Sequence, residues 1–290
     1  MLVLAAGADA QRAIQFRVEK IPNGPKVAVW FADRQERSPL ILFSHGFNGC
    51  GTQSVFFTEE LARAGYVVAA PDHADAGCSL DGRWPPRFHL PNLPFTNPGR
   101  WSDATYAGRR ADLEATLDWI LKTAPYAQLI DPARIGAAGH SLGGYSVLGL
   151  AGGWEAWRDP RISAVVALAP YVKPYLLQDR MRIIRVPVMY QAAQFDVGIT
   201  PALAGPRGAV AETGGAAYFV ELKRGNHFEW TNSACWGHRA PEDCMAKRPQ
   251  ARLIVEYARA FFDKYLKQRP AELDALKGAG LHAYRAPSSR

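Results

Sequence analysis

The chain of 290 residues has no apolar run long enough to span a membrane, so we expect no membrane span. It also has no internal repeat and no low-complexity tract, which excludes repeat architectures. With 48% hydrophobic residues, the chain can bury one substantial core. Together these features predict a single domain over residues 11–270.

No run of five or more basic residues occurs, although the formal net charge is +7. Lysine and arginine are scattered and mixed with acids, which indicates a solvated basic surface. We therefore expect no nucleic-acid partner. The overall field would attract anionic surfaces only weakly, and moderate salt would remove that attraction.

Cysteine is sparse, and no C-x-x-C spacing indicates a zinc site. The even count of four is compatible with an exported protein that forms disulfides. Cys235 and Cys244 are the candidate pair, because they bracket a short polar loop. Four free thiols are the alternative, and the state of Cys50 and Cys78 stays open.

The first ten residues are apolar except for Asp9, and they end in an A-x-A-like pattern, Ala8-Asp9-Ala10. Such a pattern is typical of the end of a signal peptide, although a whole one needs a basic start and about fifteen residues or more. Residues 1–10 are interpreted as a signal-peptide remnant or a disordered start. We expect a secreted or periplasmic protein, with a cytoplasmic one as the alternative.

Short β-rich runs alternate with helical patterns. Residues 14–20 and 26–31, joined by a turn rich in Pro and Gly, predict an antiparallel hairpin at the edge of a sheet. Residues 39–44 and 66–71 are typical of buried parallel strands, and a helix over 53–64 between them completes a βαβ unit.

The same alternation continues to residue 266. Helices are expected from residue 102 or 103 to about 122 and from about 252 to 266. Further strands are expected at 135–138, 162–168, 186–191 and 217–222. This order predicts an α/β fold with a doubly wound, mostly parallel sheet, an antiparallel N-terminal edge and helices on both faces. The aromatic, Pro-rich stretch 77–100 is an insertion within the domain, and 271–290 is a C-terminal tail.

Gly139-His140-Ser141-Leu142-Gly143 lies between the apolar run 135–138 and a small-residue stretch that can form a helix. This context matches the G-x-S-x-G elbow, in which the serine occupies a sharp strand-to-helix turn. The two glycines are needed because a side chain there would collide with the neighbouring strand and helix. Ser141 is therefore the candidate nucleophile.

A serine hydroxyl is a weak nucleophile at neutral pH, so Ser141 needs a histidine base, which in turn needs a carboxylate. His227 is favoured because it follows a predicted strand and the turn Arg224-Gly225-Asn226. The side chain of His140 is expected to point away from the nucleophile. The other histidines lie in an early loop or lack a position at a strand end: His45, His73, His89, His238 and His282.

Asp196 is the candidate acid, because it follows the strand 186–191 at its carboxyl end, where catalytic groups of open α/β sheets gather. The order Ser141, Asp196, His227 is the order of the triad in α/β-hydrolases. Other carboxylates could serve as structural caps or solvated charges instead: Asp72, Asp75, Glu221 and Glu229.

An oxyanion needs two preorganised N–H donors. The backbone N–H of Leu142 follows the nucleophile directly. The N–H of Phe47 is the second candidate, in the loop Ser44-His45-Gly46-Phe47-Asn48-Gly49 after an early strand. A Gly-rich turn without this role is the alternative for the loop.

These segments together resemble the α/β-hydrolase superfamily over nearly all of the chain. Within it, the sequence is similar to platelet-activating-factor acetylhydrolase-like and dienelactone-hydrolase-related proteins, and to cutinase-like polyester hydrolases. Dienelactone hydrolases themselves use a cysteine nucleophile, so Ser141 argues against that activity. The polyester hydrolases carry two cleft aromatics that Phe47 and Tyr171 match, although the second is usually Trp and the 78–100 loop has no counterpart there. Ordinary packing is the alternative for Tyr171.

We therefore expect a monomeric serine carboxylic-ester hydrolase that works through an acyl-enzyme, without a metal or an organic cofactor. Its substrates would be short-chain or aromatic esters, including PET-like polyesters. A lipase or phospholipid esterase of the platelet-activating-factor acetylhydrolase type is the alternative, and an acyl transferase or amidase would share the same residues. A non-catalytic binding protein on the same fold is less favoured, because such proteins usually lack a triad member.

Overall fold

The structure is a computed structural model that describes residues 13–32, 36–78, 88–235, 244–245 and 247–287. The expected signal-peptide remnant, residues 1–10, and the histidine candidate His238 lie outside these residues. No helix in the described part of the chain is long and apolar enough to cross a membrane.

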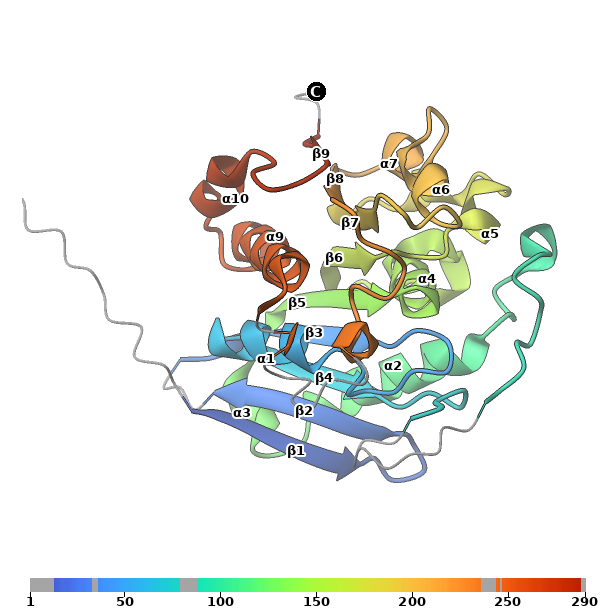
Figure 1. Cartoon of the computed structure of the whole chain (residues 1–290). Helices are drawn as coiled ribbons and strands as arrows, with labels where there is room; N and C mark the ends of the chain where they lie inside the picture. The colour runs from blue at the N-terminus through green and yellow to red at the C-terminus, as the bar shows by residue number, and fades with distance from the viewer. Residues whose placement is uncertain (1–12, 33–35, 79–87, 236–243, 246, 288–290) are drawn as a thin grey trace, which may run out of the picture.

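One sheet crosses the molecule, with its strands in the order β1-β2-β4-β3-β5-β6-β7-β8-β9 among the described residues (Figure 1). The strands are β1 (Ile14–Lys20), β2 (Lys26–Ala32), β3 (Ser38–Ser44), β4 (Val67–Pro71), β5 (Ile130–His140), β6 (Ile162–Leu168), β7 (Val188–Ala193), β8 (Ala217–Leu222) and β9 (Ala283–Arg285). Neighbours from β4 to β8 pair in parallel, while β1, β2 and β9 pair antiparallel. The predicted mostly parallel sheet with an antiparallel N-terminal edge is confirmed.

Helices cover both faces of this sheet. They are α1 (Val55–Arg63), α2 (Ala107–Ile120), α3 (Tyr126–Leu129), α4 (Leu142–Leu148), α5 (Lys173–Leu176), α6 (Thr200–Ala204), α7 (Ala209–Glu212), α9 (Pro249–Leu266) and α10 (Ala271–Leu276). Buried side chains of α1, α9 and α10 form one hydrophobic core with the sheet, and those of α2 to α7 form the other. The doubly wound arrangement is therefore confirmed.

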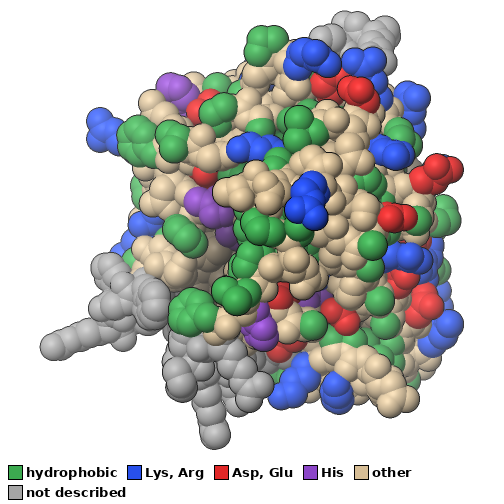
Figure 2. Space-filling model, turned by 90° about the vertical axis from the view of Figure 1, so that its right-hand side faces the viewer, with side chains coloured by type: hydrophobic (Ala, Val, Ile, Leu, Met, Phe, Trp, Pro, Cys, Tyr) green, Lys and Arg blue, Asp and Glu red, His purple; other side chains and the backbone are tan. Residues whose placement is uncertain are grey.

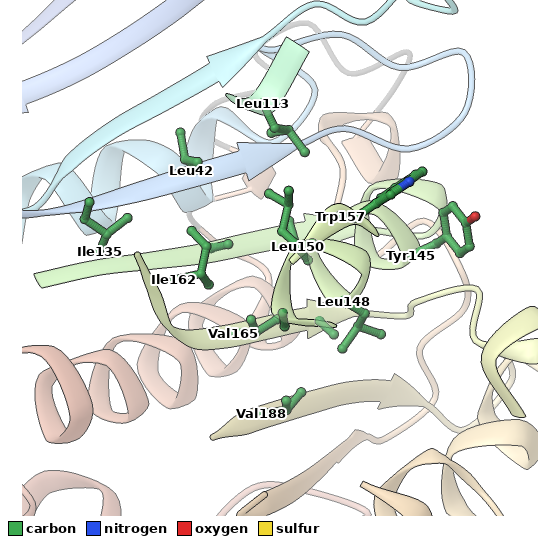
Figure 3. Close-up of a cluster of buried hydrophobic side chains, with 14 of the residues drawn as sticks. Leu42, Leu113, Ile135, Tyr145, Leu148, Leu150, Trp157, Ile162, Val165 and Val188 are labelled. Atoms are coloured by element: carbon green, nitrogen blue, oxygen red, sulfur yellow. The ribbon is translucent and has the colours of Figure 1, made fainter. Parts of the chain in front are cut away.

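The strands supply both cores because successive side chains point to opposite faces of a sheet. In β3, Leu40 and Leu42 join the core under α2 and α4, whereas Ile41 and Phe43 join the core under α1 and α9. Figure 3 shows part of the first core, which Leu113 of α2 and Leu148 of α4 share with side chains of four neighbouring strands: Leu42, Ile135, Val165 and Val188. Burying each such side chain contributes about 1.5–3 kcal/mol to folding.

The helix expected from residue 102 or 103 begins at Ala107 instead. Ser102 and Thr105 form a turn, in which the Ser102 N–H donates to Thr105 Oγ1 at 3.0 Å and the Thr105 N–H donates to the Ser102 carbonyl at 2.9 Å. Tyr106 then has a φ of 63°, in the left-handed region that cannot continue a right-handed helix. Residues 102–106, which were expected to form the first turn of the helix, therefore form a separate turn before it.

The segment after residue 270, expected to be a tail, is part of the domain. It forms α10 and then β9, which pairs antiparallel with β8. Leu273 and Leu281 are buried in the core that α9 covers. The sequence predicts that the helix at about 252–266 is the last element of the domain. Instead, Leu273 and Leu281 pack beside α9, and the chain then returns to the edge of the sheet as β9.

Candidate active site

The loops that carry the candidate residues leave the same edge of the sheet. In the parallel register Ser44 pairs with Gly139, at the carboxyl ends of β3 and β5, and Ala193 pairs with Leu222 near the ends of β7 and β8. Ligands of open α/β sheets bind at this edge. Figure 2 views the molecule from this side, where hydrophobic side chains are scattered around histidines.

Ser141 lies between β5 and α4 in a strained turn, with φ 54° and ψ −113°. A Cβ on Gly143 would lie 1.9 Å from the Ser44 carbonyl oxygen, and one on Gly139 would lie 2.4 Å from the Gly143 carbonyl oxygen. Glycine at 143 therefore lets the start of α4 approach β3, and glycine at 139 lets it lie against the end of β5. The Ser141 N–H donates to the Leu168 carbonyl at 2.9 Å, which holds the turn.

The structure brings Ser141, His227 and Asp196 into one hydrogen-bonded chain. His227 Nε2 lies 2.9 Å from Ser141 Oγ, and His227 Nδ1 lies 2.6 Å from Asp196 Oδ2. The carboxylate can only accept, so Nδ1 carries the proton and Nε2 accepts from the serine hydroxyl. Asp196 is buried, whereas the His227 side chain is 27% exposed. Ser141 is also partly exposed, so the serine end of this chain is open to solvent.

A second serine, histidine and aspartate make the same contacts elsewhere. Ser44 Oγ lies 2.9 Å from His73 Nε2, and His73 Nδ1 lies 3.0 Å from Asp112 Oδ2. Burial and the nearby Arg109 charge lower the pKa of His73 well below its ordinary value, and burial raises the pKa of Asp112 to about 7. Ser44 is fully buried, so no substrate can reach it. A serine, histidine and aspartate joined by hydrogen bonds do not by themselves identify a nucleophile. The two sets differ in the exposure of the serine, and this difference favours Ser141.

Three of the other carboxylates considered from the sequence have partners away from His227. Asp72 accepts a hydrogen bond from the Gly51 N–H at 2.8 Å, and burial raises its pKa to about 6. Asp75 pairs with Arg109 at 2.7 Å, and Glu229 pairs with Arg248.

His140 points away from Ser141, as expected, but it contacts the loop of the candidate base. Its Nε2–H donates to the His227 carbonyl at 2.9 Å, and its Nδ1 accepts from Gln53 Nε2 at 3.3 Å. Gln53 Oε1 in turn accepts from the Gly46 N–H at 3.0 Å. Sequence reasoning missed Gln53, because a glutamine before a helix carries no motif.

One candidate oxyanion donor lies in the elbow itself, and the other lies in a different loop. Leu142 is the first residue of α4, and Phe47 lies in the loop after β3. Neither backbone N–H donates a hydrogen bond to another described residue. Both donors are therefore available to a ligand, and their role as an oxyanion hole stays a prediction.

The two candidate cleft aromatics lie against the part of the 77–100 insertion that the structure describes. Tyr171 is buried, and its hydroxyl donates to the Phe95 carbonyl. The Phe95 ring lies 5.0 Å from the Tyr171 ring and 5.7 Å from the Phe47 ring, measured between centroids, and Trp101 lies 5.1 Å from Tyr171. Tyr171 thus packs in an aromatic cluster, and a role for it in substrate binding stays a prediction.

Two disulfides lie near these loops. Cys235 is joined to Cys244, the pair considered from the sequence, and Cys50 is joined to Cys78. The second bond ties the end of the Phe47 loop to the start of the insertion. Among the described residues, no group of three or more His, Cys, Asp or Glu side chains could hold a metal ion.

A family model described as platelet-activating factor acetylhydrolase, isoform II, matches residues 23–81 of the chain. The matched segment holds β2, β3, α1, β4 and the Phe47 loop, and it ends before the elbow. Comparison with curated proteins found no match. The match supports an ester hydrolase. The sheet has the architecture of the α/β-hydrolase fold, and over residues 23–81 the chain resembles the platelet-activating factor acetylhydrolases.

Proposed function

We propose that the protein is a serine carboxylic-ester hydrolase that works through an acyl-enzyme. The observation that carries this proposal is the hydrogen-bonded chain from Ser141 through His227 to Asp196, with the serine on a strained elbow and the histidine partly exposed. A serine activated in this way attacks acyl carbonyls.

In the proposed reaction, Ser141 Oγ bonds to the ester carbonyl carbon while its proton passes to His227 Nε2. The backbone N–H groups of Phe47 and Leu142 bind the oxyanion, and Asp196 stabilises the charged imidazole. The proton then goes to the leaving alcohol, which departs and leaves an acyl-serine. A water molecule then attacks the acyl-serine while His227 accepts its proton. The proton returns to Ser141 Oγ, and the carboxylic acid is released. No step needs a metal or an organic cofactor.

The substrates we propose are short-chain or aromatic esters, with PET-like polyesters among them. Apolar side chains next to the acid and base support an apolar acyl or aryl group: Phe195 is 57% exposed, Val197 83% and Phe228 58%. A phospholipid ester is the second candidate, and the family match over residues 23–81 favours it.

Two disulfides favour a secreted or periplasmic location, because such bonds persist in oxidising compartments. We also propose that the protein acts as a monomer. Its mass in solution, measured by light scattering, tests this second point, and a dimer would contradict it.

The two serine sets allow a sharp test of the nucleophile. A fluorophosphonate probe reacts only with an activated serine, so it should label the wild-type protein and Ser44→Ala but not Ser141→Ala. Ser141→Ala should also lose turnover of p-nitrophenyl acetate and butyrate while its circular dichroism spectrum stays unchanged. Wild-type turnover in Ser141→Ala would overturn the proposal, and an unlabelled wild-type protein would favour the binding-protein alternative.

A substrate panel tests the specificity. It should span acyl length and include an aryl diester, a polyester film, a short-acyl phospholipid, an amide and an alcohol acceptor. Cleavage of short soluble esters alone would remove both the polyester and the phospholipid proposals. If the acyl group passes to the alcohol faster than to water, the same residues would belong to an acyl transferase. If the amide is cleaved faster than the esters, they would belong to an amidase.

A further inference from the structure

The peptide unit between Gly46 and Phe47 carries the candidate oxyanion donor, and the inference here rests on the proposed function. This peptide is trans, and in a trans peptide the carbonyl and the N–H point in opposite directions. Whatever fixes the Gly46 carbonyl therefore fixes the direction of the Phe47 N–H. The loop packs directly on the elbow, since a Cβ on Gly143 would lie 2.7 Å from the His45 carbonyl oxygen.

Two donors converge on the Gly46 carbonyl oxygen. One is Arg109, whose NH2 group lies 3.2 Å away, and the other is His45 Nδ1, at 2.7 Å. Burial, reinforced by the Arg109 charge, lowers the pKa of His45 to about 3, so its imidazole is neutral. Its Nε2 accepts from the His73 N–H at 3.0 Å, so the single ring proton is on Nδ1 and is donated to Gly46.

The Arg109 guanidinium is itself fixed by five contacts. Its Nε and NH2 groups bind both carboxylate oxygens of Asp75, at 3.0 and 2.7 Å. Its NH1 group reaches the His45 carbonyl at 2.7 Å and Ser44 Oγ at 3.5 Å. A guanidinium has five N–H donors, so with Gly46 each has an acceptor. Arg109 is only 2% exposed and thus holds two successive carbonyls of the loop from inside the protein.

The Asp75 carboxylate keeps its charge in this buried place. Burial alone would raise the pKa of Asp75, but the charge and hydrogen bonds of Arg109 outweigh it and hold the pKa below its ordinary value. The carboxylate is therefore ionised, and a guanidinium, which always carries its charge, makes a stronger hydrogen bond to a carbonyl than a neutral donor does.

We infer that Arg109, fixed by Asp75, is a positioning residue that turns the Gly46 carbonyl inward and thereby aims the Phe47 N–H at the oxyanion. The same bond draws electron density toward Gly46 O and strengthens the N–H donor, because hydrogen bonds in a chain polarise one another. Removing one oxyanion donor costs about 10²–10³ in kcat. If the Phe47 N–H points away from the oxyanion, kcat should fall, but by less than this factor.

The test compares Arg109→Lys and Arg109→Met with Arg110→Met. Arg110 is the next residue of α2, is partly exposed and pairs with Glu114, so it is a matched control. Titration with a fluorophosphonate counts the active sites of each variant, so that loss of folded protein is separated from loss of rate. Per titrated site, kcat for p-nitrophenyl butyrate should fall about 30- to 100-fold in Arg109→Met and less in Arg109→Lys, with KM within about threefold.

A trifluoromethyl ketone adds a readout that a merely structural role would not move, because it forms an oxyanion on the serine. Its affinity should fall by the same factor as kcat/KM, while Arg110→Met stays at the wild-type level. Unchanged kcat per titrated site in both Arg109 variants would overturn the inference. If the wild type itself shows no ester turnover, the proposed function fails instead.

Asp75→Asn provides a second route in case the Arg109 variants do not fold. It keeps the size of the side chain and one acceptor but removes the charge that fixes Arg109. We expect kcat per titrated site to fall about three- to tenfold, with KM unchanged, since Arg109 keeps its bond to Gly46 but loses its anchor. A rise in KM with an unchanged kcat would contradict the positioning role.

Discussion

His140 donates a hydrogen bond from Nε2 to the backbone carbonyl of His227 at 2.9 Å. The residue that precedes the candidate nucleophile therefore holds the backbone of the candidate base. Gln53 extends this contact to Gly46, which precedes the candidate oxyanion donor Phe47. One chain of hydrogen bonds thus links the loops after β3, β5 and β8.

Replacing Gln53 by leucine should loosen this link. Leucine has a similar size but leaves the buried Gly46 N–H and His140 Nδ1 without partners, which costs about 1–3 kcal/mol of unfolding free energy. We expect kcat to fall roughly tenfold, less than the ~100-fold that a 1 Å misplacement can cause. Urea unfolding and ester turnover measure the two effects.

Gln250→Leu is the control for this change, because Gln250 lies at the start of α9 and makes one long bond, to the Lys223 carbonyl at 3.4 Å. Gln250→Leu should leave both the unfolding free energy and kcat close to their wild-type values. Equal effects of the two substitutions would mean that the link through Gln53 has no special role.

His140→Gln should make the fold less sensitive to acid. Burial, with a smaller contribution from the neighbouring His227, lowers the pKa of His140 well below its ordinary value of 6.5. As the pH falls through about 6.5, the unfolded chain binds a proton at residue 140 that the folded protein does not bind, so acid favours unfolding. Between about pH 7.5 and pH 5, this one group removes about 2 kcal/mol of stability.

Glutamine keeps a donor for the His227 carbonyl but does not titrate. Urea unfolding at the two pH values should therefore show a loss of stability about 2 kcal/mol smaller in the variant than in the wild type. The other buried groups, His45, His73 and Asp112, are common to both proteins and cancel in this comparison. If the unfolding free energies of the wild type and of His140→Gln fall equally between the two pH values, His140 is not neutral in the folded protein.

The parts of the molecule that could be predicted from the sequence depend on local patterns. The strand before Ser141, the glycines around it and the strand ends before Asp196 and His227 all lie within a few residues of the side chains that they place. Parallel strands then bring these ends to one edge without further information.

The parts that could not be predicted depend on side chains that meet from distant elements. Asp75 and Arg109 meet only because β4 and α2 lie at a particular spacing, and the set of Ser44, His73 and Asp112 needs the same packing. No periodicity encodes such contacts. The C-terminal return over α10 and β9 was missed for a related reason, since two isolated leucines do not form a pattern.

A glycine of the elbow and a glycine of α2 differ in how much space a new side chain would find. Gly143→Ala should prevent folding or displace α4, because the new Cβ would lie 1.9 Å from the Ser44 carbonyl oxygen. Gly108→Ala in the first turn of α2 meets nothing within 4 Å and should raise the unfolding free energy by about 0.5–1 kcal/mol. Thermal unfolding with fluorophosphonate labelling checks both, and a labelled, stable Gly143→Ala protein would contradict the close packing of the elbow.

The two disulfides should differ in their effect on stability and on activity. A chain-entropy argument assigns roughly 3.5 kcal/mol to the Cys50–Cys78 bond, with a sequence separation of 28, and roughly 2.5 kcal/mol to Cys235–Cys244, with a separation of 9. Cys50→Ser/Cys78→Ser should therefore lower the unfolding free energy by about 1 kcal/mol more than Cys235→Ser/Cys244→Ser.

The Cys50–Cys78 bond also lies closer to the proposed oxyanion loop. Near it, the Gly77 N–H donates to the Gly49 carbonyl at 2.9 Å, so the disulfide and this bond tie the end of the Phe47 loop to the insertion. Its loss should reduce kcat per titrated site, because the Phe47 N–H would be held less firmly, whereas loss of the other bond should leave kcat nearly unchanged. If both double variants keep wild-type kcat, the loop does not need this disulfide, and Arg109 together with His45 is sufficient to hold the Gly46 carbonyl.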